Sequence, residues 1–171
     1  GKQAATEVDG TAYWMSENGF FRYTGQLESM DCLVEDFVYD DLNTTSNQLI
    51  NAGLNNLFGE VIWFYCSNGS NVVNRMVTYN YIDSSVQRGI WTTGSLNRTA
   101  WQDSAVFGKP HATAYDIDDD DSFDVTGNTD GSSIYYEHET GNNQIKGGTT
   151  TAIAANIQSG DFDITSDQDR G

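Results

Sequence analysis

Cysteine is scarce in this chain: Cys32 and Cys66 are the only two in 171 residues. Two thiols do not make the disulfide framework that holds a small secreted domain together. They also fall in segments that we predict to be separate elements. We therefore expect two buried free thiols, with a single bridge between them as the alternative.

Long apolar runs are missing as well. No stretch has the length that a bilayer crossing needs, and no positively charged segment followed by an apolar core marks a signal peptide. We expect no membrane insertion by this segment.

Basic residues are few, 8 against 25 acidic ones, which gives a net charge of -17. A surface of this charge repels nucleic acids and anionic membranes instead of gripping their phosphates. The excess has two readings. It keeps a protein in solution, or it makes a surface unattractive to DNA or other anions that pass close by.

The residues that are abundant are those of strands joined by turns: Gly, Asn, Thr and Ser, with 12% Phe, Trp and Tyr. This aromatic content argues against general disorder. The length suits one domain. The one predicted helix covers residues 33–42, where Leu33, Phe37 and Val38 share a face.

Short apolar or alternating segments bounded by turn residues predict the strands. The segment 60–66 is almost continuously apolar, as in a strand buried on both faces. Residues 17–19, with an Asn-Gly pair, predict a hairpin turn. The predicted strands are 10–16, 20–24, 27–30, 48–55, 60–66, 75–81, 89–96, 99–101, 112–115, 133–137 and 152–158.

The fold class predicted from this pattern is all-β, with antiparallel four-stranded sheets repeated as β-propeller blades. The approximate blades are 10–31, 48–96 and 99–158, and a final strand at 160–171 begins another. A β-sandwich built from the same strands is the alternative. Because a closed propeller needs four to eight blades, we expect 1–171 to be part of a single propeller domain and of a longer chain.

Seven phrases stand in a recognisable order along the chain. They are residues 12–25, 34–43, 60–65, 79–81, 94–101, 137–141 and 159–164. In order and spacing they resemble a family of phage virion proteins, the packaged-DNA stabilisation or tail hub and nozzle proteins of short-tailed phages. The resemblance runs from about Gly10 to Ile164, and each phrase alone is short.

The resemblance implies a structural virion protein of a phage tail, bearing a β-propeller and contributing to the DNA channel. It implies a ring of copies, six in that family, that contacts portal, adaptor and tail fibre proteins, with DNA only as cargo. Family members are several times longer. The family carries no catalytic motif, so we predict no enzyme, no cofactor and no metal. The alternative function is a carbohydrate-binding β-rich module that recognises host glycans.

The acidic run 116–131 holds seven carboxylates in sixteen positions. Asp116, Asp118 and Asp120 match the first three ligand positions of a helix-loop-helix calcium site. Asp121 stands where that loop needs glycine, and Gly127 offers no side-chain oxygen at the last ligand position. We interpret the run as a solvated loop, with a weakly held cation as the alternative.

Glu60 and the two histidines are the other polar candidates. Glu60 precedes an aromatic strand, and a catalytic role is less favoured there than that of a strand-edge gatekeeper against aggregation. His111 and His138, the latter between Glu137 and Glu139, lack the helical spacing of zinc motifs. We expect turn or surface histidines.

Seven aromatic residues could form a platform on which sugars stack, or could fill the spaces between sheets. Each lies inside an apolar strand, which favours the core. They are Tyr13, Trp14, Trp63, Phe64, Tyr65, Trp91 and Trp101.

Overall fold

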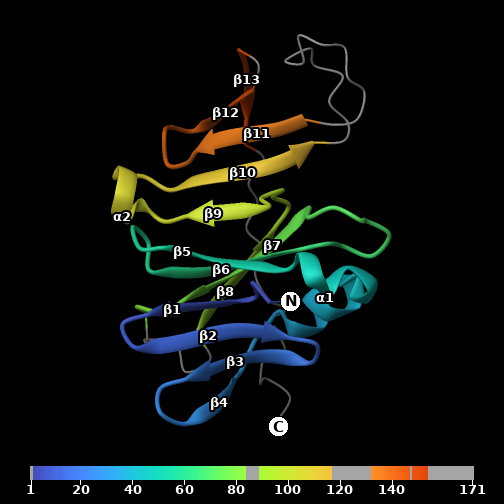
Figure 1. Ribbon diagram of the computed structural model, residues 1–171, viewed down its shortest axis with the longest axis vertical. Coiled ribbons are helices and arrows are strands. Elements are labelled where there is room, and N and C mark those ends of the chain that lie inside the picture. The colour runs from blue at the N-terminus through green and yellow to red at the C-terminus, as the bar shows by residue number, and fades with distance from the viewer. Residues whose placement is uncertain (1, 84–88, 117–131, 147, 154–171) are drawn as a thin grey trace, which may run out of the picture. The chain divides into compact units, whose positions relative to one another are not determined.

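The computed structural model describes residues 2–83, 89–116, 132–146 and 148–153. Contacts divide the chain into two compact units, Gly1–Thr140 and Gly141–Gly171. Strands predominate, and every pair of neighbouring strands is antiparallel (Figure 1). The all-β prediction is confirmed.

The first sheet contains four strands in chain order: β1 (Ala5–Val8), β2 (Thr11–Ser16), β3 (Gly19–Tyr23) and β4 (Leu27–Met30). The predicted range 10–31 misses β1. The turn between β1 and β2 is Asp9-Gly10, and both residues have positive φ, 52° and 79°. An Asp-Gly pair with this backbone is a preferred two-residue hairpin connection.

The second sheet is the predicted four-stranded meander: β5 (Asn51–Asn55), β6 (Glu60–Tyr65), β7 (Arg75–Asn80) and β8 (Ile90–Gly94). In β6 every residue after Glu60 is buried. Because side chains alternate between the two faces of a strand, both faces of this sheet are covered, as predicted.

The third sheet has three strands, in the order β11-β10-β9: β9 (Ala100–Gln102), β10 (His111–Asp116) and β11 (Ser132–Glu137). The short helix α2 (Ser104–Phe107) joins β9 to β10. In the second unit, β12 (Asn143–Lys146) and β13 (Thr149–Ala152) pair with each other. Three of the four strands predicted over 99–158 therefore form one sheet. The predicted strand at 160–171, and that at 152–158 beyond Ile153, lie outside the described residues.

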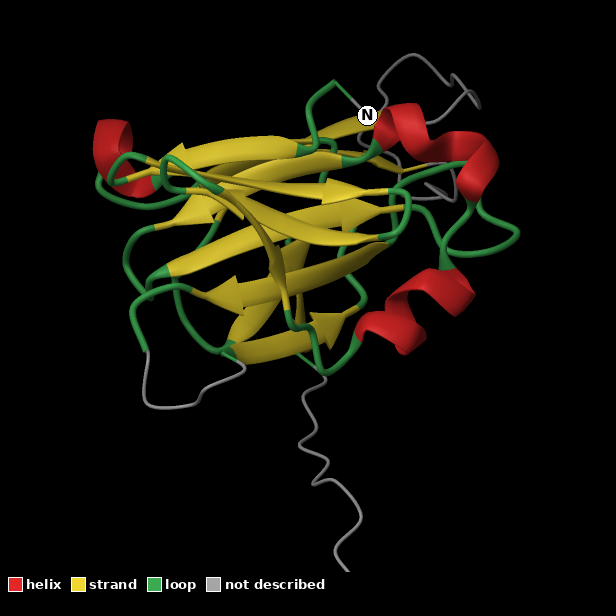
Figure 2. Cartoon of the chain, turned by 90° about the horizontal axis from the view of Figure 1, so that it is seen from below, coloured by secondary structure: helices red, strands yellow, loops and turns green. Residues whose placement is uncertain are grey.

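The helix α1 (Glu35–Asp41) confirms the helix predicted at 33–42, but the predicted apolar face is wrong by one residue. Leu33 and Phe37 are 58% and 59% exposed, whereas Val38 is fully buried and Leu42 is 7% exposed. The 3-10 helix η1 (Thr44–Leu49) occupies the first part of the strand predicted at 48–55. Helices α1 and α2 lie at opposite ends of the strands (Figure 2).

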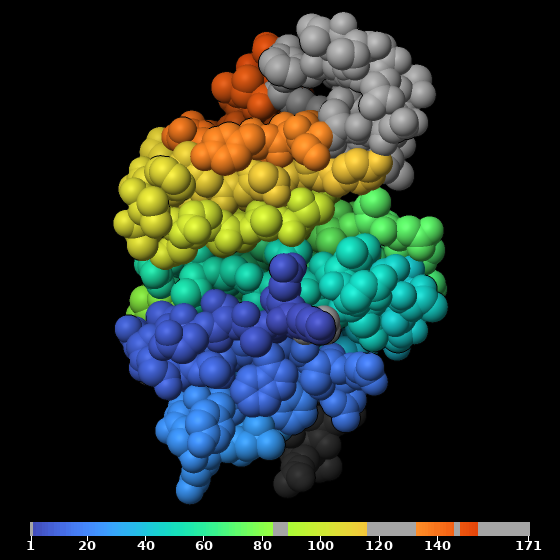
Figure 3. Space-filling model, viewed as in Figure 1, coloured from blue at the N-terminus to red at the C-terminus, as the bar shows by residue number. Residues whose placement is uncertain are grey.

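The three sheets of the first unit meet at their first strands. β1 contacts β5, and β5 contacts β9. The amide of Ala52 donates a 2.8 Å hydrogen bond to the carbonyl of Gln3, beside a parallel bridge between Gln3 and Asn51. The second sheet therefore lies between the other two, which form separate bands of the surface (Figure 3).

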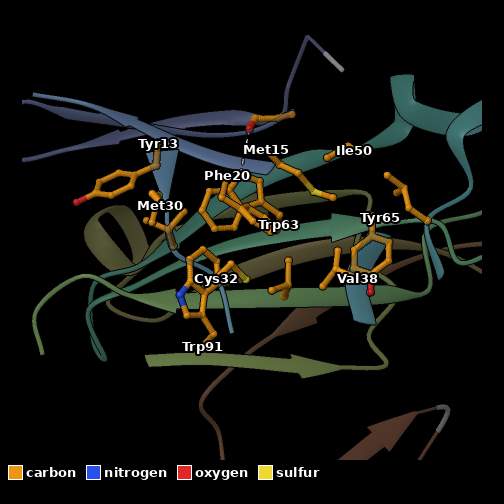
Figure 4. Close-up of a cluster of buried hydrophobic side chains, with 14 residues drawn as sticks. Tyr13, Met15, Phe20, Met30, Cys32, Val38, Ile50, Trp63, Tyr65 and Trp91 are labelled. Atoms are coloured by element: carbon orange, nitrogen blue, oxygen red, sulfur yellow. Dashed lines mark hydrogen bonds between the residues drawn. The ribbon is translucent and has the colours of Figure 1, made fainter. Parts of the chain in front are cut away.

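The core between the first and second sheets is aromatic (Figure 4). The ring of Phe20 lies 5.0 Å from that of Trp63 and 4.8 Å from that of Trp91, centroid to centroid. Both indoles donate hydrogen bonds to backbone oxygens at the two ends of the first sheet. Trp63 Nε1 donates to the carbonyl of Ala4, just before β1, at 3.0 Å, and Trp91 Nε1 donates to that of Asp31, just after β4, at 3.1 Å. Each ring thus buries a large apolar area with its N–H satisfied.

The core interpretation of the aromatic residues is confirmed for five of the seven. Those that are buried are Tyr13, Trp63, Phe64, Tyr65 and Trp91. Cys32 and Cys66 are free and buried, also as predicted. Burial raises the pKa of the Cys32 thiol to about 12, so it stays protonated.

Candidate functional site

A row of polar and charged side chains lies between the second and third sheets, beside an apolar cluster of Ile62, Phe64, Cys66 and Val73. The inward face of β5 supplies two asparagines, because its alternate residues are buried toward the third sheet. We call this row the polar seam. Its members are Asn51, Asn55, Glu60, Arg98, His138 and Glu139.

Arg98, only 8% exposed, is the cation of the seam. Its Nε donates to His138 Nε2 at 2.8 Å, its Nη1 donates to the carbonyl of Asn97 at 2.5 Å, and its Cζ lies 3.9 Å from the centroid of the Tyr136 ring. No carboxylate of the described residues pairs with it. Burial lowers the pKa of Arg98 to about 10, so the guanidinium stays charged at neutral pH and is stabilised by the π face beneath it.

His138 follows the end of β11 and is half-buried, with its ring 4.7 Å from that of Trp101. It was predicted to be a turn or surface residue, but its ring is packed between sheets. Burial above all, then Arg98 and His111, lowers its pKa to about 4. Because Nε2 accepts from Arg98, the proton of the neutral ring is on Nδ1. The lone pair of Nε2 is therefore already used by this hydrogen bond, so Nε2 is not available as a base or as a metal ligand.

The close approach of the two sheets depends on Gly53. A Cβ at this position would lie 2.5 Å from Cδ1 of Trp101, whose Nε1 donates to the carbonyl of Leu54 at 2.6 Å. Only glycine lets the indole reach the backbone of β5.

Glu60, Glu139 and Asn55 form the other end of the seam. Asn55 faces Glu60 across the β5–β6 register, and its Nδ2 donates to Glu139 Oε1 at 3.3 Å. Burial, and then the charge of Glu139, raises the pKa of Glu60. Glu60 is the first residue of β6, a central strand that pairs on both sides, so it flanks an apolar strand but does not lie on a sheet edge. Its gatekeeper role stays a prediction.

The two histidines do not come together. His111 is the first residue of β10, and its ring stacks on that of Tyr135 at 5.3 Å, on the face of the third sheet away from the seam. Its Nδ1 contacts the Tyr135 hydroxyl at 2.5 Å. The arrangement therefore offers no shared metal site to the pair.

An open hollow of about 350 Å³ lies beside α1. The ion pair between Arg75 Nε and Asp41 Oδ2, 2.9 Å apart, forms one wall. The other lining residues are Phe37, Asp40 and Asn68. Of these residues the sequence singled out only Phe37, as part of the apolar face of the predicted helix.

The acidic run and the possible metal sites remain to be placed. The acidic run lies outside the described residues, apart from the backbone of Asp116 in β10. In the part of the chain that the structure describes, no three His, Cys, Asp or Glu side chains gather as a metal site would require. Within the same ranges, no helix has the length and apolar character of a membrane span.

Sequence reasoning missed Arg98 as a functional residue. Its partners lie about forty positions away along the chain, at Tyr136 and His138. No local periodicity links such positions, so the only available signal was a rare cation in an acidic sequence.

Comparison with known proteins adds no relative. A scan against protein-family models finds no match, and a search of curated proteins finds none either.

Proposed function

We propose that the chain is a structural segment of a phage tail nozzle or hub, in which the three sheets of the first unit are consecutive blades of a β-propeller. The proposal combines the ordered phrases that resemble that family with the arrangement of the sheets. It assigns the protein an assembly role and no chemical step.

The order of the strands is the observation that best supports a propeller arrangement. Each sheet starts at a common centre, where β1, β5 and β9 are neighbours, and then runs outward strand by strand (Figure 1). Propeller blades are four-stranded sheets placed around a central channel in this way. A two-sheet sandwich gives each sheet one covered face, whereas the second sheet here is covered on both.

The end faces of the stack support an assembly role. On the first sheet, the face opposite the core presents the stacked pair Trp14–Phe21, with ring centroids 5.8 Å apart, and beside it Tyr23 and Leu27, 49% and 65% exposed. On the third sheet, Tyr135 is 63% exposed. Large apolar side chains gathered on a sheet face mark a surface that packs against something, here a further sheet of the same kind.

The net negative charge of the chain is consistent with a channel through which DNA passes. A wall with an excess of carboxylates repels the phosphates and leaves no adhesive contacts to slow ejection. The partners in this proposal are further copies in a ring, six by the resemblance, together with portal, adaptor and tail fibre proteins. The site of action is the virion.

Electron microscopy of the assembled ring tests the proposal. We expect the acidic side chains to be concentrated on the channel wall. A neutral or basic wall would contradict the channel role.

Glycan recognition is the second candidate, and the Trp14–Phe21 pair is the observation that favours it. Trp63 and Trp91 are buried and cannot stack on a sugar. In a glycan array, Trp14→Ala should abolish binding while the protein stays folded. Binding that survives this replacement would exclude the pair as the platform.

A further inference from the structure

Five large apolar side chains are exposed at the end of the first unit where β1, β5 and β9 finish. They come from the β5–β6 turn, from the segment after β7 and from α2, and each is half exposed or more. The β5–β6 turn and α2 lie at the same end of the strands (Figure 1). We call this surface the apolar end patch. Its members are Leu57, Phe58, Ile82, Val106 and Phe107.

Contacts between the three segments make the apolar end patch one surface. Asn56, in the β5–β6 turn, donates from its backbone N at 3.0 Å and from its Nδ2 at 2.6 Å to the two carboxylate oxygens of Asp103, the residue before α2. Gly59 ends the same turn, and a Cβ there would overlap Cδ1 of Ile82. Ile82 therefore packs on the backbone beside Phe58.

Carboxylates border the apolar end patch. Burial above all, then the charges of Asp9 and Asp103, raises the pKa of Tyr81, at the edge of the patch. Glu139 Oε1 accepts a 3.3 Å hydrogen bond from Nδ2 of Asn55, just before the β5–β6 turn. Asp9 belongs to the first sheet, whereas Asp103 and Glu139 flank strands of the third. The rim is therefore negative on both sides of the second sheet.

Basic residues do not balance this rim. Among the described residues of the connections at this end, Lys109 is the only lysine or arginine, and its Nζ lies 3.2 Å from Oε1 of Glu137 in an ion pair. The rim repels DNA and anionic membranes, and it repels a second copy of a chain whose net charge is -17. A complementary partner exposes apolar side chains flanked by Lys or Arg.

We propose that the apolar end patch binds a basic amphipathic segment of another protein. Exposed apolar surface with a polar rim is typical of protein–protein contacts, and an amphipathic helix commonly covers such a surface. The apolar face of the segment packs on Phe58 and Phe107, and its basic side chains lie opposite Asp9 and Glu139. The proposal is independent of the propeller, because the patch lies at the ends of the strands and not on the outer face of the first or third sheet.

A synthetic peptide of leucine and lysine tests the proposal, in an order that gives an amphipathic helix. A scrambled peptide of the same composition is the control. Fluorescence anisotropy of the labelled peptides measures binding to the 171-residue chain at physiological ionic strength, where long-range attraction is screened. The amphipathic peptide should bind at least about tenfold tighter, because only it presents a continuous apolar face. Equal affinities would show attraction by net charge alone and would overturn the proposal.

Substitutions locate the bound peptide. Phe58→Ser combined with Phe107→Ser should weaken binding of the amphipathic peptide at least about tenfold. Leu33→Ser combined with Phe37→Ser is the matched control, because it removes two similarly exposed side chains beside α1, at the opposite end of the strands (Figure 2). Thermal unfolding checks that both variants stay folded, as expected for exposed positions. Unchanged binding in the patch variant, or an equal loss in the control, would overturn the proposal.

The acidic rim is tested separately. Asp9→Asn combined with Glu139→Gln should weaken peptide binding severalfold and reduce its dependence on salt. Asn suits the positive φ of 52° at the first of these positions. Glu17→Gln combined with Asp40→Asn removes the same charge at the other end and should leave binding unchanged. Equal losses in the two variants would show that total charge and not the rim attracts the peptide, and would contradict the assignment.

Sedimentation of the 171-residue chain without peptide tests the competing occupant. We expect no self-association through the apolar end patch, because both copies carry the acidic rim. A dimer that Phe58→Ser with Phe107→Ser dissociates would assign the patch to a second copy and overturn the proposal.

Discussion

The two interfaces of the second sheet are built differently. Toward the first sheet it presents Trp63 and Trp91 around the ring of Phe20, and the polar atoms there are indole N–H groups bonded to backbone oxygens. Toward the third sheet it presents a smaller apolar cluster and the polar seam, where the guanidinium of Arg98 is buried and the ionisable carboxyl group of Glu60 is half-buried.

The two interfaces should therefore differ in how strongly their stability depends on pH and salt. The aromatic interface gains free energy from buried apolar area, which salt and pH hardly change. The seam depends on groups whose charge is costly to bury and whose partners can be changed by protons or ions. We expect the first interface to hold the fold and the second to respond to conditions.

The largest effect should come from the aromatic interface. Trp63→Ala should lower the free energy of unfolding by about 3–5 kcal/mol, because it opens a cavity in contact with Phe20 and Trp91. Urea titration measures the loss. The partly exposed Trp14 is the control, and Trp14→Ala should cost about 1 kcal/mol. Equal losses would show that this core is not the main source of stability.

The second largest effect should come from a substitution at the interface of the second and third sheets. Gly53→Ala should cost about 1–3 kcal/mol, because the new methyl group overlaps the Trp101 indole. Gly94→Ala is the matched control, since its Cβ would meet only the flexible end of Met76, 2.8 Å away. Thermal unfolding of both variants compares them. A tolerated Gly53→Ala would mean that the third sheet is held loosely.

The third effect is a pH dependence from His138. Its pKa, 6.5 in the unfolded chain, is about 4 in the folded protein, so the unfolded state takes up a proton first. The contribution to stability is complete above pH 6.5 and is lost as pH falls toward 4. The shift corresponds to about 3 kcal/mol, and solvent screening of the half-buried ring reduces the expected loss to about 1–2 kcal/mol. Glu60 acts in the opposite direction, because its raised pKa favours protonation of the folded state.

Urea midpoints at pH 7 and pH 4.5, compared between wild type and variants, measure the contribution of His138 to the loss of stability. His138→Gln should reduce the loss between these two values, and His111→Gln, on the other face of the sheet, should keep most of it. A loss that is the same in wild type and His138→Gln would contradict this role of the seam.

The sequence predicted those parts of the fold that short-range patterns encode. Continuous apolar character identified β6 as a strand with two covered faces, and turn residues delimited the second sheet. The Asp9-Gly10 pair was an available signal for β1 that the prediction did not use. The face of α1 was misjudged because two turns of helix are too short for periodicity to choose between adjacent registers.

The polar seam could not be predicted in the same way. Asn55, Arg98 and Glu139 come together only because the second and third sheets pack on each other. Their contacts have long sequence separations, and nothing in the local pattern distinguishes them from other polar residues of an acidic chain. Glu60 was noticed, but its neighbours were not.

Electron microscopy of the assembled protein distinguishes a propeller from a sandwich. If the sheets are propeller blades, β1, β5 and β9 line a common axis and another β-sheet covers Trp14, Tyr23 and Leu27 on the first sheet. A particle in which this face remains in water, with the sheets arranged as an isolated sandwich, would contradict it.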